Sequence, residues 1–525
     1  MTVKQFTIEI DGKAVEVNEN MTVLDAAVAG GIEIPALCFS RQYGTCNTCM
    51  VCAVRDLEKD IIPACSTKVN PGMHVDASGP EIREFRRHAL EFLLAEHVGD
   101  CDAPCRLSCP VFFDVPAMLH KIAADDFTAA ADLIHDGMPL PHLSCMLCKR
   151  RPCEKACRRG RHDTPLEIVA ALHAALKTKD FPAEERPRKY SIAVVGSGCA
   201  GLAAADMLSK RDCRCTVFES GDKPGMEIAG LLAPENLWLL ENELARLAAA
   251  GIEFKCSAKI MPEDIAGRLL EEFDAALLCV GSRSMTAFSP LLKTDENGAF
   301  TKLQSFMTSI DGVFAAEDMA IHASGIQAVA DGVEAGHAVI SWLEHGRHFI
   351  AENRYDHRFG EVTPEDMQQF TDGTGSVKTE VTDNTSAALE ASRCLHCDCR
   401  KYDNCLLRKY ASEYLTQQIR IPSQRHAFRR INAGDIIYEP GKCIRCGICI
   451  KIGEVGGKAV GPVFKGRGYE VEMGAPLGHS MTEALEGIGP ECAAACPTGA
   501  LSRKIKRKKS GVRSQESGDR SQETE

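Results

Sequence analysis

The stretch IAVVGSGCAGLAAADML, residues 192–208, predicts a strand, a glycine-rich turn and a helix in succession. Gly196, Gly198 and Gly201 form the pattern G-x-G-x-x-G, and Glu219 ends the next apolar strand, CTVFE. Such glycines let backbone amides and the helix N-terminus approach a pyrophosphate, while the acid binds a ribose hydroxyl. The middle of the chain is therefore predicted to be an α/β domain that binds a dinucleotide.

Two later segments indicate which dinucleotide is bound. DGVFAAEDMA (311–320) follows the apolar DAALLCVGS (274–282) and precedes GIQAVADGVEAGHAVISWL (325–343). These strings resemble the closing motifs of the FAD domain in the glutamate synthase small subunit. The resemblance implies FAD, with Asp318 near the ribityl chain and the next helix pointing its N-terminus at the flavin ring. The cofactor-binding residues that we predict are Gly196, Gly198, Ala200, Gly201, Glu219, Asp318, Gly325 and Gln327.

The α/β domain departs from that family in three places. Glu317 stands where the family has a glycine, and the stretch KPGMEIAGLL is shortened and altered. The family also carries a second glycine-rich unit that binds NADPH, and no second G-x-G-x-x-G follows here. We therefore expect no nicotinamide to bind in that way. A Rossmann-like fold without a cofactor is the alternative.

The chain has 26 cysteines among 525 residues, and most of them lie within a few residues of another. The N-terminus lacks the basic and apolar pattern of a secretory signal, so we expect a cytoplasmic protein. Clustered cysteines in a reducing compartment indicate metal ligands or redox groups. No apolar run is long enough for a membrane helix. The net charge of −12 argues against nucleic-acid binding.

The first cysteine group, Cys38, Cys49, Cys52 and Cys65, has the spacing C-x10-C-x2-C-x12-C. Four converging thiolates suit a [2Fe–2S] cluster. With the hairpin pattern around residues 5–17, the group resembles the plant-type ferredoxin domain of complex I's large iron–sulfur subunit and of the hydrogenase diaphorase small subunit. An alternative frame that uses Cys46 and Cys49 has the spacing C-x7-C-x2-C and fits the family less well.

Two cysteine runs follow, and eight of their side chains are candidate ligands of two [4Fe–4S] clusters. The first run has the pattern H-x3-C-x3-C-x3-C-P, and the second has C-x2-C-x4-C-x3-C. They contain His97, Cys101, Cys105, Cys109, Cys145, Cys148, Cys153 and Cys157. The runs resemble the N-terminal region of the glutamate synthase small subunit and dihydropyrimidine dehydrogenase, in which the two loops exchange ligands.

The exchange implied by that resemblance places Cys101 and Cys105 with Cys157 in one cluster, and Cys109 with Cys148 and Cys153 in the other. The fourth ligands stay open. His97 is either an iron ligand through a ring nitrogen or a solvent-facing residue at a helix end. The second cluster takes Cys145 or His173, and we favour Cys145.

Two further cysteine groups lie toward the C-terminus. RCLHCDCRKYDNC contains Cys394, Cys397, Cys399 and Cys405, which we predict to bind one [4Fe–4S] cluster, with zinc as the alternative. KCIRCGICIKI and CPTGAL together contain Cys443, Cys446, Cys449 and Cys496. The latter pattern resembles a [4Fe–4S] site of complex I's large subunit, and Cys492 is a spare or a competitor for the fourth place.

The predicted fold class is multidomain, α+β and α/β. We expect a β-grasp ferredoxin domain over 1–80, a helical two-cluster domain over 81–187 and a Rossmann-like FAD domain over 188–350. A linker with a cluster segment over 351–430, a C-terminal [4Fe–4S] domain over 431–505 and a disordered tail over 506–525 complete the chain. The two ends resemble one family, and the middle resembles another inserted between them.

Three hypotheses follow for function. The first is an electron-transfer subunit of a cytoplasmic oxidoreductase in an anaerobe, which connects a nicotinamide- or flavin-binding partner to a catalytic partner such as a hydrogenase or formate dehydrogenase. The second is a self-sufficient NAD(P)H-dependent oxidoreductase like the glutamate synthase small subunit. The third is a non-enzymatic iron–sulfur scaffold. We favour the first, because many clusters are expected with one flavin and no nicotinamide unit. No catalytic acid, base or nucleophile stands out.

Overall fold

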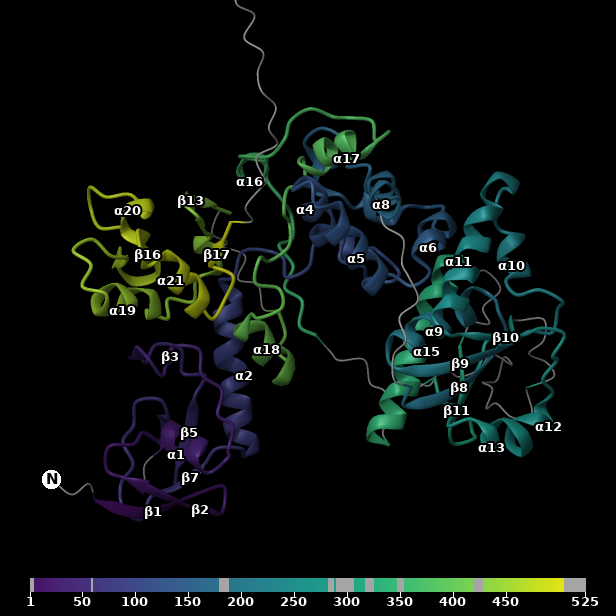
Figure 1. Cartoon of the computed structure of the whole chain (residues 1–525). Coiled ribbons are helices and arrows are strands. Elements are labelled where there is room, and N and C mark those ends of the chain that lie inside the picture. The colour runs from purple at the N-terminus through teal and green to yellow at the C-terminus, as the bar shows by residue number, and fades with distance from the viewer. Residues whose placement is uncertain are drawn as a thin grey trace, which may run out of the picture.

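The structure is a computed structural model of the chain (Figure 1). It describes residues 4–57, 60–178, 188–281, 288, 306–316, 325–346, 354–418 and 428–504. Among these residues, no helix is long and apolar enough to cross a membrane. Asp318 and the predicted disordered tail lie outside the described residues.

The N-terminal region is a five-stranded sheet with the strand order β2-β1-β7-β5-β6, crossed by helix α1. The predicted hairpin is confirmed, because β1 and β2 pair in antiparallel register around Asp11 and Gly12, both of which have positive φ. A two-residue turn of this kind matches the twist of paired strands. Its elements are β1 (Gln5–Ile10), β2 (Lys13–Asn18), α1 (Val23–Ala29), β3 (Phe39–Ser40), β4 (Gly44–Thr45), β5 (Ala53–Asp56), β6 (Ile61–Pro63) and β7 (His74–Asp76).

Helix α2 (Pro80–Ala95) joins this sheet to the rest of the molecule. Its apolar residues recur at helical spacing, and Ile82, Leu90 and Leu94 are buried. The buried Arg86 on the same helix donates from Nε to the carbonyl oxygen of Ala53 at 2.8 Å. The helix therefore fixes the ferredoxin region against α18 (Leu406–Glu413), which packs on its other side.

The central region is helical, and a segment predicted to be a linker folds onto it. Helix α17 (Asn384–Ala391) buries Ala387 and Ala391 in the same core as α4 and α8. Arg393, just beyond this helix, donates to Glu390 at 2.6 Å and to Asp163 at 2.9 Å. The polar composition of the segment concealed these buried ion pairs. The other elements are α3 (Pro104–Leu107), α4 (Val115–Ala123), α5 (Phe127–Gly137), α6 (Pro141–Leu147), α7 (Pro152–Lys155), α8 (Ile168–Leu176) and α16 (Pro364–Thr371).

The α/β region has a parallel sheet with the strand order β10-β9-β8-β11-β12, as the sequence predicts. Helix α15 (Gly325–His345) lies so close to α9 (Cys199–Lys210) that a Cβ at Gly332 would overlap the backbone of Ala200. The other elements are β8 (Tyr190–Val195), β9 (Cys213–Phe218), α10 (Met226–Ala229), α11 (Leu237–Ala249), β10 (Glu253–Lys255), α12 (Pro262–Asp264), α13 (Leu270–Glu272), β11 (Ala275–Leu278) and β12 (Val313–Ala315).

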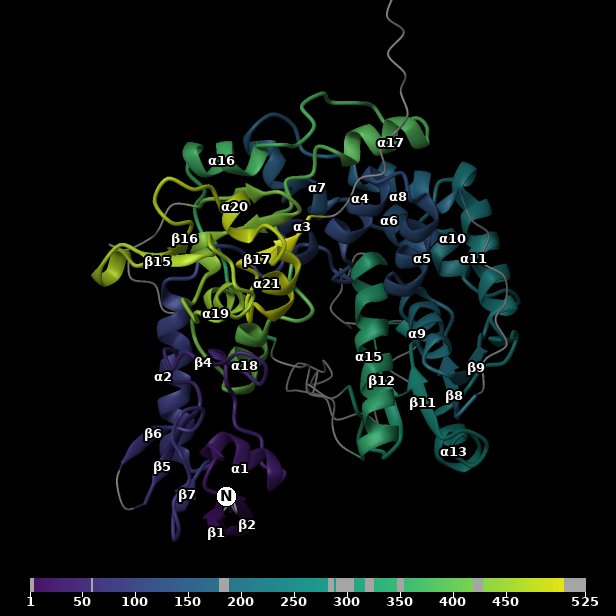
Figure 2. The same cartoon turned by 60° about the vertical axis from the view of Figure 1, so that its left-hand side comes forward.

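The C-terminal region contains a three-stranded antiparallel sheet, β13-β14-β17, and a two-stranded one, β15-β16. Its apolar side chains continue into the core of the ferredoxin region, so the two ends of the chain share one core. Figure 2 shows the C-terminal elements next to α2 and above the ferredoxin strands. The elements are β13 (Ile431–Ala433), β14 (Ile436–Tyr438), α19 (Ile448–Val455), β15 (Val463–Lys465), β16 (Glu472–Gly474), α20 (Met481–Leu485), α21 (Gly489–Ala495) and β17 (Leu501–Arg503).

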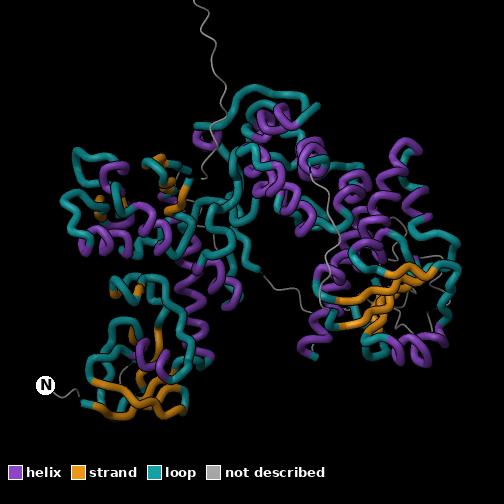
Figure 3. Tube along the Cα trace, viewed as in Figure 1, coloured by secondary structure: helices purple, strands orange, loops and turns teal. Residues whose placement is uncertain are grey.

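Figure 3 shows strands concentrated in the ferredoxin and α/β regions, with the helical region between them. A buried charge network joins the helical region to the α/β region. Asp206 on α9 accepts from the backbone amide of Leu140 at 2.9 Å and pairs with Arg246 at 3.0 Å and Lys210 at 3.2 Å. Lys210 in turn donates to the carbonyl oxygen of His135 at 2.5 Å.

Candidate redox centres

The four predicted ferredoxin ligands converge in a buried loop system. The Cys38 sulfur lies within hydrogen-bonding reach of the sulfurs of Cys49 and Cys65, and these contacts hold its pKa below the ordinary value. The Cys52 sulfur makes a similar contact with Cys65, which also lies 3.0 Å from the hydroxyl of Thr45. All four thiols are buried. This grouping supports the frame with Cys49 and Cys52 over the one that uses Cys46.

Cys46, the surplus cysteine of this region, faces the C-terminal region instead. Gly447 has a φ of +75°, and a Cβ there would lie 2.7 Å from the Cys46 sulfur. Beside it, Thr48 donates to the carbonyl oxygen of Arg445 at 3.5 Å. The loop that holds Cys46 therefore contacts the loop between two candidate ligands of the C-terminal site.

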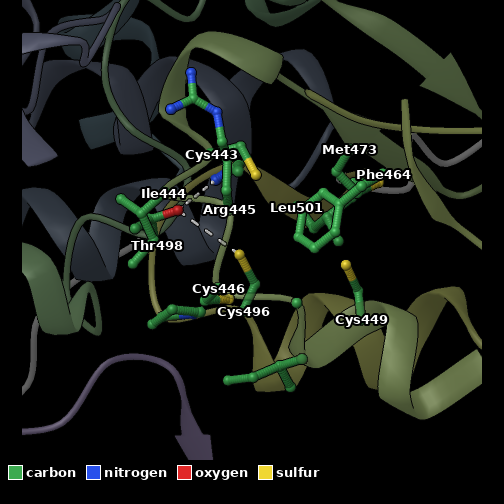
Figure 4. Close-up of a pocket in the computed structure, with 14 residues that line it drawn as sticks. Cys443, Ile444, Arg445, Cys446, Cys449, Phe464, Met473, Cys496, Thr498 and Leu501 are labelled. Atoms are coloured by element: carbon green, nitrogen blue, oxygen red, sulfur yellow. Dashed lines mark hydrogen bonds between the residues drawn. The ribbon is translucent and has the colours of Figure 1, made fainter. Parts of the chain in front are cut away.

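The predicted C-terminal ligands line one small, mainly apolar cavity (Figure 4). Ile444, Phe464, Met473 and Leu501 supply much of its apolar wall. The sulfurs that reach it are those of Cys443, Cys446, Cys449 and Cys496.

Cys492, which competed with Cys496 for the fourth place, lies buried on α21. Its S–H donates to the carbonyl oxygen of Cys449 at 3.8 Å, so its sulfur is engaged with backbone. Cys496 is therefore the better fourth candidate.

Cys101 lies near Cys399 and Cys405, two cysteines that follow the α/β region in the sequence. The backbone amide of Cys399 donates to the carbonyl oxygen of Cys101 at 3.1 Å. Burial, with smaller contributions from Cys399 and Cys405, raises the pKa of Cys101 to about 12, while Arg408 opposes the rise. These neighbours favour a grouping of Cys101 with Cys399 and Cys405 over the predicted grouping with Cys105.

His97 is partly buried just after the end of α2. Its ring meets His357 edge to face, with 4.9 Å between centroids. Burial, then His357 and Lys442, hold its pKa well below the ordinary value, which favours the neutral imidazole that binds metals. Lys442 also neighbours Cys399, so His97 is the candidate fourth donor at the Cys101 site.

Cys105 groups with Cys157 as predicted, but the other two members of this site come from the C-terminal half. The pKa of Cys105 is raised first by burial and then by Cys394, Cys397 and Cys157. Cys157 likewise raises the pKa of Cys394 and of Cys397. The prediction of one site for the segment 394–405 is not supported, because Cys394 and Cys397 lie near Cys105 and Cys157, whereas Cys399 and Cys405 lie near Cys101.

The last group is Cys109, Cys145, Cys148 and Cys153. Burial raises the pKa of Cys145 well above the ordinary value, and the three other thiols of the group raise it further. His173, the alternative fourth donor, has its pKa lowered to about 4 by burial and then by His142, Arg151 and Lys177. Its Nε2 atom is buried without a hydrogen-bond partner among the described residues. The observed grouping favours Cys145.

These donor sets match the chemistry of iron–sulfur clusters, which spread four thiolates over several irons. For Cys105 and Cys145, burial and neighbouring thiols disfavour the ionised form, and bound cations relieve that repulsion. Among the described residues, no three histidine, cysteine or acidic side chains come close enough together to hold a single metal ion.

The predicted dinucleotide loop has the backbone that the glycine pattern requires. Gly196 has a φ of +107°, and a Cβ there would overlap the carbonyl oxygen of Cys279, the residue after β11. A Cβ at Gly201 would overlap the carbonyl of Gly196, so α9 begins in direct contact with the strand end. Gly198 is the residue before α9, and Ala200 is buried in its first turn.

Glu219 directly follows β9 and lies beside this loop, at the position predicted to contact a ribose. Its carboxylate accepts from the Ser197 hydroxyl at 2.5 Å and from the amide of Gly221 at 2.7 Å. Burial alone would raise the pKa of Glu219, but these hydrogen bonds lower it below the ordinary value. The Ser197 hydroxyl also accepts from the amide of Gly225 at 2.9 Å, so the acid is held against the glycine loop.

The start of α15 brings the α/β region to the nearest cysteine group. A Cβ at Gly325 would lie 3.2 Å from the side chain of Leu147, which adjoins Cys148. Cys148 itself packs against the core of the α/β region. Gln327 points along its own helix, with Nε2 3.4 Å from Asp331.

Three family models match separate parts of the chain. The one described as 2Fe-2S iron-sulfur cluster binding domain matches residues 3–79. Dihydropyrimidine dehydrogenase domain II, 4Fe-4S cluster, matches residues 92–179, and NAD(P)-binding Rossmann-like domain matches residues 194–237. The chain is thus a multidomain iron–sulfur protein with a Rossmann-like domain.

Curated relatives are subunits of oxidoreductases. NADPH-Fe(3+) oxidoreductase subunit beta of Geobacter sulfurreducens is 30% identical over 38% of this chain and 32% of the relative. The NAD-reducing hydrogenase HoxS subunit gamma of Cupriavidus necator is 29% identical over 27% of this chain and 62% of the relative.

The glutamate synthase [NADPH] small chain of Mycobacterium tuberculosis is 31% identical over 35% of this chain and 39% of the relative. The alignments thus span between 32% and 62% of these relatives' lengths. The resemblance to iron–sulfur oxidoreductases of the glutamate synthase and hydrogenase diaphorase types, as expected from the motifs, is confirmed.

Proposed function

We propose that the chain is an electron-transfer subunit of a multisubunit oxidoreductase, with one [2Fe–2S] cluster, four [4Fe–4S] clusters and FAD. The observation that carries this proposal is that five cysteine groups form one continuous series from the α/β region to the ferredoxin region. Cofactors supply the redox chemistry, and the protein supplies the route between them.

The series can be followed through contacts of the described residues. Cys148 packs on the α/β core, and its group adjoins that of Cys105, where the Ser108 hydroxyl donates to the Pro152 carbonyl at 3.2 Å. Cys397 and Cys399 then lead from the Cys105 group to the Cys101 group.

The remaining steps run through the C-terminal region. A Cβ at Gly499 would overlap the Cys399 sulfur, so the Cys101 group adjoins the loop after Cys496. Cys46 and Gly447 then connect the C-terminal cavity to the ferredoxin site. Electrons would thus enter or leave at either end of the series.

The ligand sets that we propose follow the observed grouping rather than the order of motifs. The [2Fe–2S] cluster takes Cys38, Cys49, Cys52 and Cys65. The four [4Fe–4S] clusters take Cys109, Cys145, Cys148 and Cys153; Cys105, Cys157, Cys394 and Cys397; His97, Cys101, Cys399 and Cys405; and Cys443, Cys446, Cys449 and Cys496.

FAD is proposed at the glycine loop, with Glu219 toward the ribose and the start of α15 toward the flavin. We propose the domain boundaries given by the sequence, except that the segment around α17, residues 381–394, belongs with the helical region, whose core it shares. The partners would be a nicotinamide-oxidising flavoprotein and a catalytic subunit of the hydrogenase or formate dehydrogenase type, and the location would be cytoplasmic.

Anaerobic purification from the native host tests this proposal. We expect co-purifying redox subunits, about 18 iron atoms per chain for the five clusters and one FAD. The isolated chain should be reduced by dithionite but oxidise NAD(P)H slowly. Rapid NAD(P)H oxidation by the isolated chain, or the absence of flavin, would contradict it.

A second function, a self-sufficient NAD(P)H-dependent oxidoreductase, is favoured by one finding. The family model that matches residues 194–237 is described as NAD(P)-binding. This function predicts that NADH or NADPH bleaches the flavin of the isolated chain within one turnover. Anaerobic stopped-flow spectroscopy distinguishes the two, because an electron-transfer subunit would show that bleaching only with its partner present.

A further inference from the structure

Glu439 lies buried after β14, and three cations converge on its carboxylate. Lys442 Nζ lies 2.6 Å from one oxygen, while Arg400 and Arg430 donate to the other at 3.2 and 3.3 Å. No side chain of the four is more than 10% exposed. One carboxylate therefore faces three cations, so the four side chains together carry a net positive charge, and the buried Asp398 is a further acidic group near Arg400 and Lys442. Buried charges are rarely retained without a partner.

The three cations lie next to segments that carry different cysteine groups. Lys442 precedes Cys443 and neighbours Cys399, and Gly99 makes room for it, since a Cβ there would lie 2.5 Å from its Cε. Arg400 follows Cys399 in the chain.

Arg430 reaches the loop between Cys394 and Cys397. Its guanidinium donates to the carbonyl oxygens of Leu395 at 3.4 Å and His396 at 3.3 Å. The three cysteine groups are thus connected through cations to one buried carboxylate, that of Glu439, which is not a ligand candidate in any of them.

We infer that Glu439, Arg400, Arg430 and Lys442, here called the cation node, raise the reduction potentials of the three neighbouring [4Fe–4S] sites. The inference rests on the proposed function, because it takes the three cysteine groups as cluster sites. One-electron reduction at such a site adds one negative charge, with no bond formed or broken and no proton required. The electron comes from the reduced flavin or a partner's redox centre. Net charge and hydrogen bonding near a cluster set its potential, so the net positive charge of the node favours the reduced form.

The [2Fe–2S] site and the Cys109 group provide an internal comparison. Among the described residues, the main groups that shift the pKa of Cys38, Cys109, Cys145 and Cys153 do not include any member of the node. Their potentials should therefore be insensitive to changes at the node, whereas those of the three adjoining groups should shift together.

Lys442→Met tests the inference, because it removes one positive charge and leaves Glu439 paired with two arginines. The full chain is purified anaerobically, its iron and sulfide are counted, and a dithionite titration is followed by EPR. At fixed potential we expect the reduced-to-oxidised ratio of the Cys101 and Cys443 groups to fall about tenfold, which is 59 mV for a one-electron couple. Glu439→Gln should raise the ratio.

Lys210→Met is the matched control, since it makes the same change in the buried network around Asp206, far along the chain from these groups. It should leave every potential unchanged. Full iron with unmoved potentials in Lys442→Met, or shifts of the same sign in Lys442→Met and Glu439→Gln, would overturn the inference.

Two further results separate this inference from the proposed function. Few clusters in the wild-type chain would refute the proposed function itself. If Lys442→Met alone loses iron, Arg400→Gln is compared with the charge-conserving Arg400→Lys, and equal potentials in that pair overturn the inference.

Discussion

The ferredoxin site and the Cys101 site use the same ligand chemistry but assemble it in different ways. Cys38 and Cys65 belong to one small domain, and a sheet and one helix position both. Cys101 and Cys405 are separated in sequence by the helical and α/β regions, yet the backbone of Cys101 and Cys399 is hydrogen-bonded at 3.1 Å.

This difference shows how a chain can interrupt a metal site without destroying it. The entropy of closing a loop grows slowly with length, by about 0.6 kcal/mol per doubling. An inserted region that folds with its two ends together removes even that requirement. The segment between Cys101 and Cys399 meets this condition, because its ends meet in the structure.

The largest expected effect concerns the division of the cysteines of segment 394–405 between two sites. Cys394→Ser and Cys399→Ser should each remove one cluster, about four iron atoms, and the double variant about eight. A single local site predicts a loss of about four in all three variants. Iron and sulfide counts with EPR decide between these outcomes, and Cys46→Ser, which changes a surplus thiol, should lose none.

A second prediction concerns the contact between the ferredoxin and C-terminal regions. Gly447→Val should destabilise the chain by about 2 to 4 kcal/mol, from left-handed strain and overlap with the Cys46 sulfur. Gly457→Val is the control, since that glycine has a φ of +63° with open space around its Cβ position. Denaturant unfolding should show a larger loss at Gly447, partly recovered by Cys46→Ala. An equal loss at both glycines would refute this contact.

The α/β region has a pH dependence of its own. Burial would raise the pKa of Asp206, but Arg246 and Lys210 lower it below the ordinary value of 3.8. Its contribution to stability is therefore present above that value and declines as the pH falls below it. Both tryptophans, Trp238 and Trp342, lie in this region and report its unfolding by fluorescence.

Asp206→Asn tests this contribution. The variant should unfold more easily near neutral pH. It should also lose the part of the fall in stability below pH 3.8 that is due to this carboxyl group. A decline of the same steepness in the variant and the wild type would show that other groups cause it.

The smallest effect concerns a purely local feature. Thr22 caps α1, accepting from the amide of Asp25 at 3.1 Å, and Ser480 caps α20 in the same way at 3.3 Å. Thr22→Ala should cost about 1 kcal/mol and broaden only the [2Fe–2S] EPR signal. Ser480→Ala removes the corresponding helix cap, that of α20, in the C-terminal region. Broadening of the central clusters by Thr22→Ala would show that the ferredoxin region is not independent.

Short-range patterns were sufficient for the parts of the molecule that fold locally. The Asp11–Gly12 hairpin and the strand, glycine turn and helix at Gly196 follow the predictions closely. Each depends on contacts between residues near one another in sequence, where spacing carries the information. The convergence of Cys38, Cys49, Cys52 and Cys65 belongs to the same class.

The sequence alone thus determined the kinds of domain, the number of cysteine groups and most of their members. Only the tertiary structure decided which cysteines stand together, because Cys399 belongs with Cys101 while Cys394, five residues earlier, belongs with Cys105. It also decided that Arg400, Arg430 and Lys442 meet at Glu439. Spacing along the chain holds no information about such partners, since they meet only after the inserted regions have packed and brought their ends together.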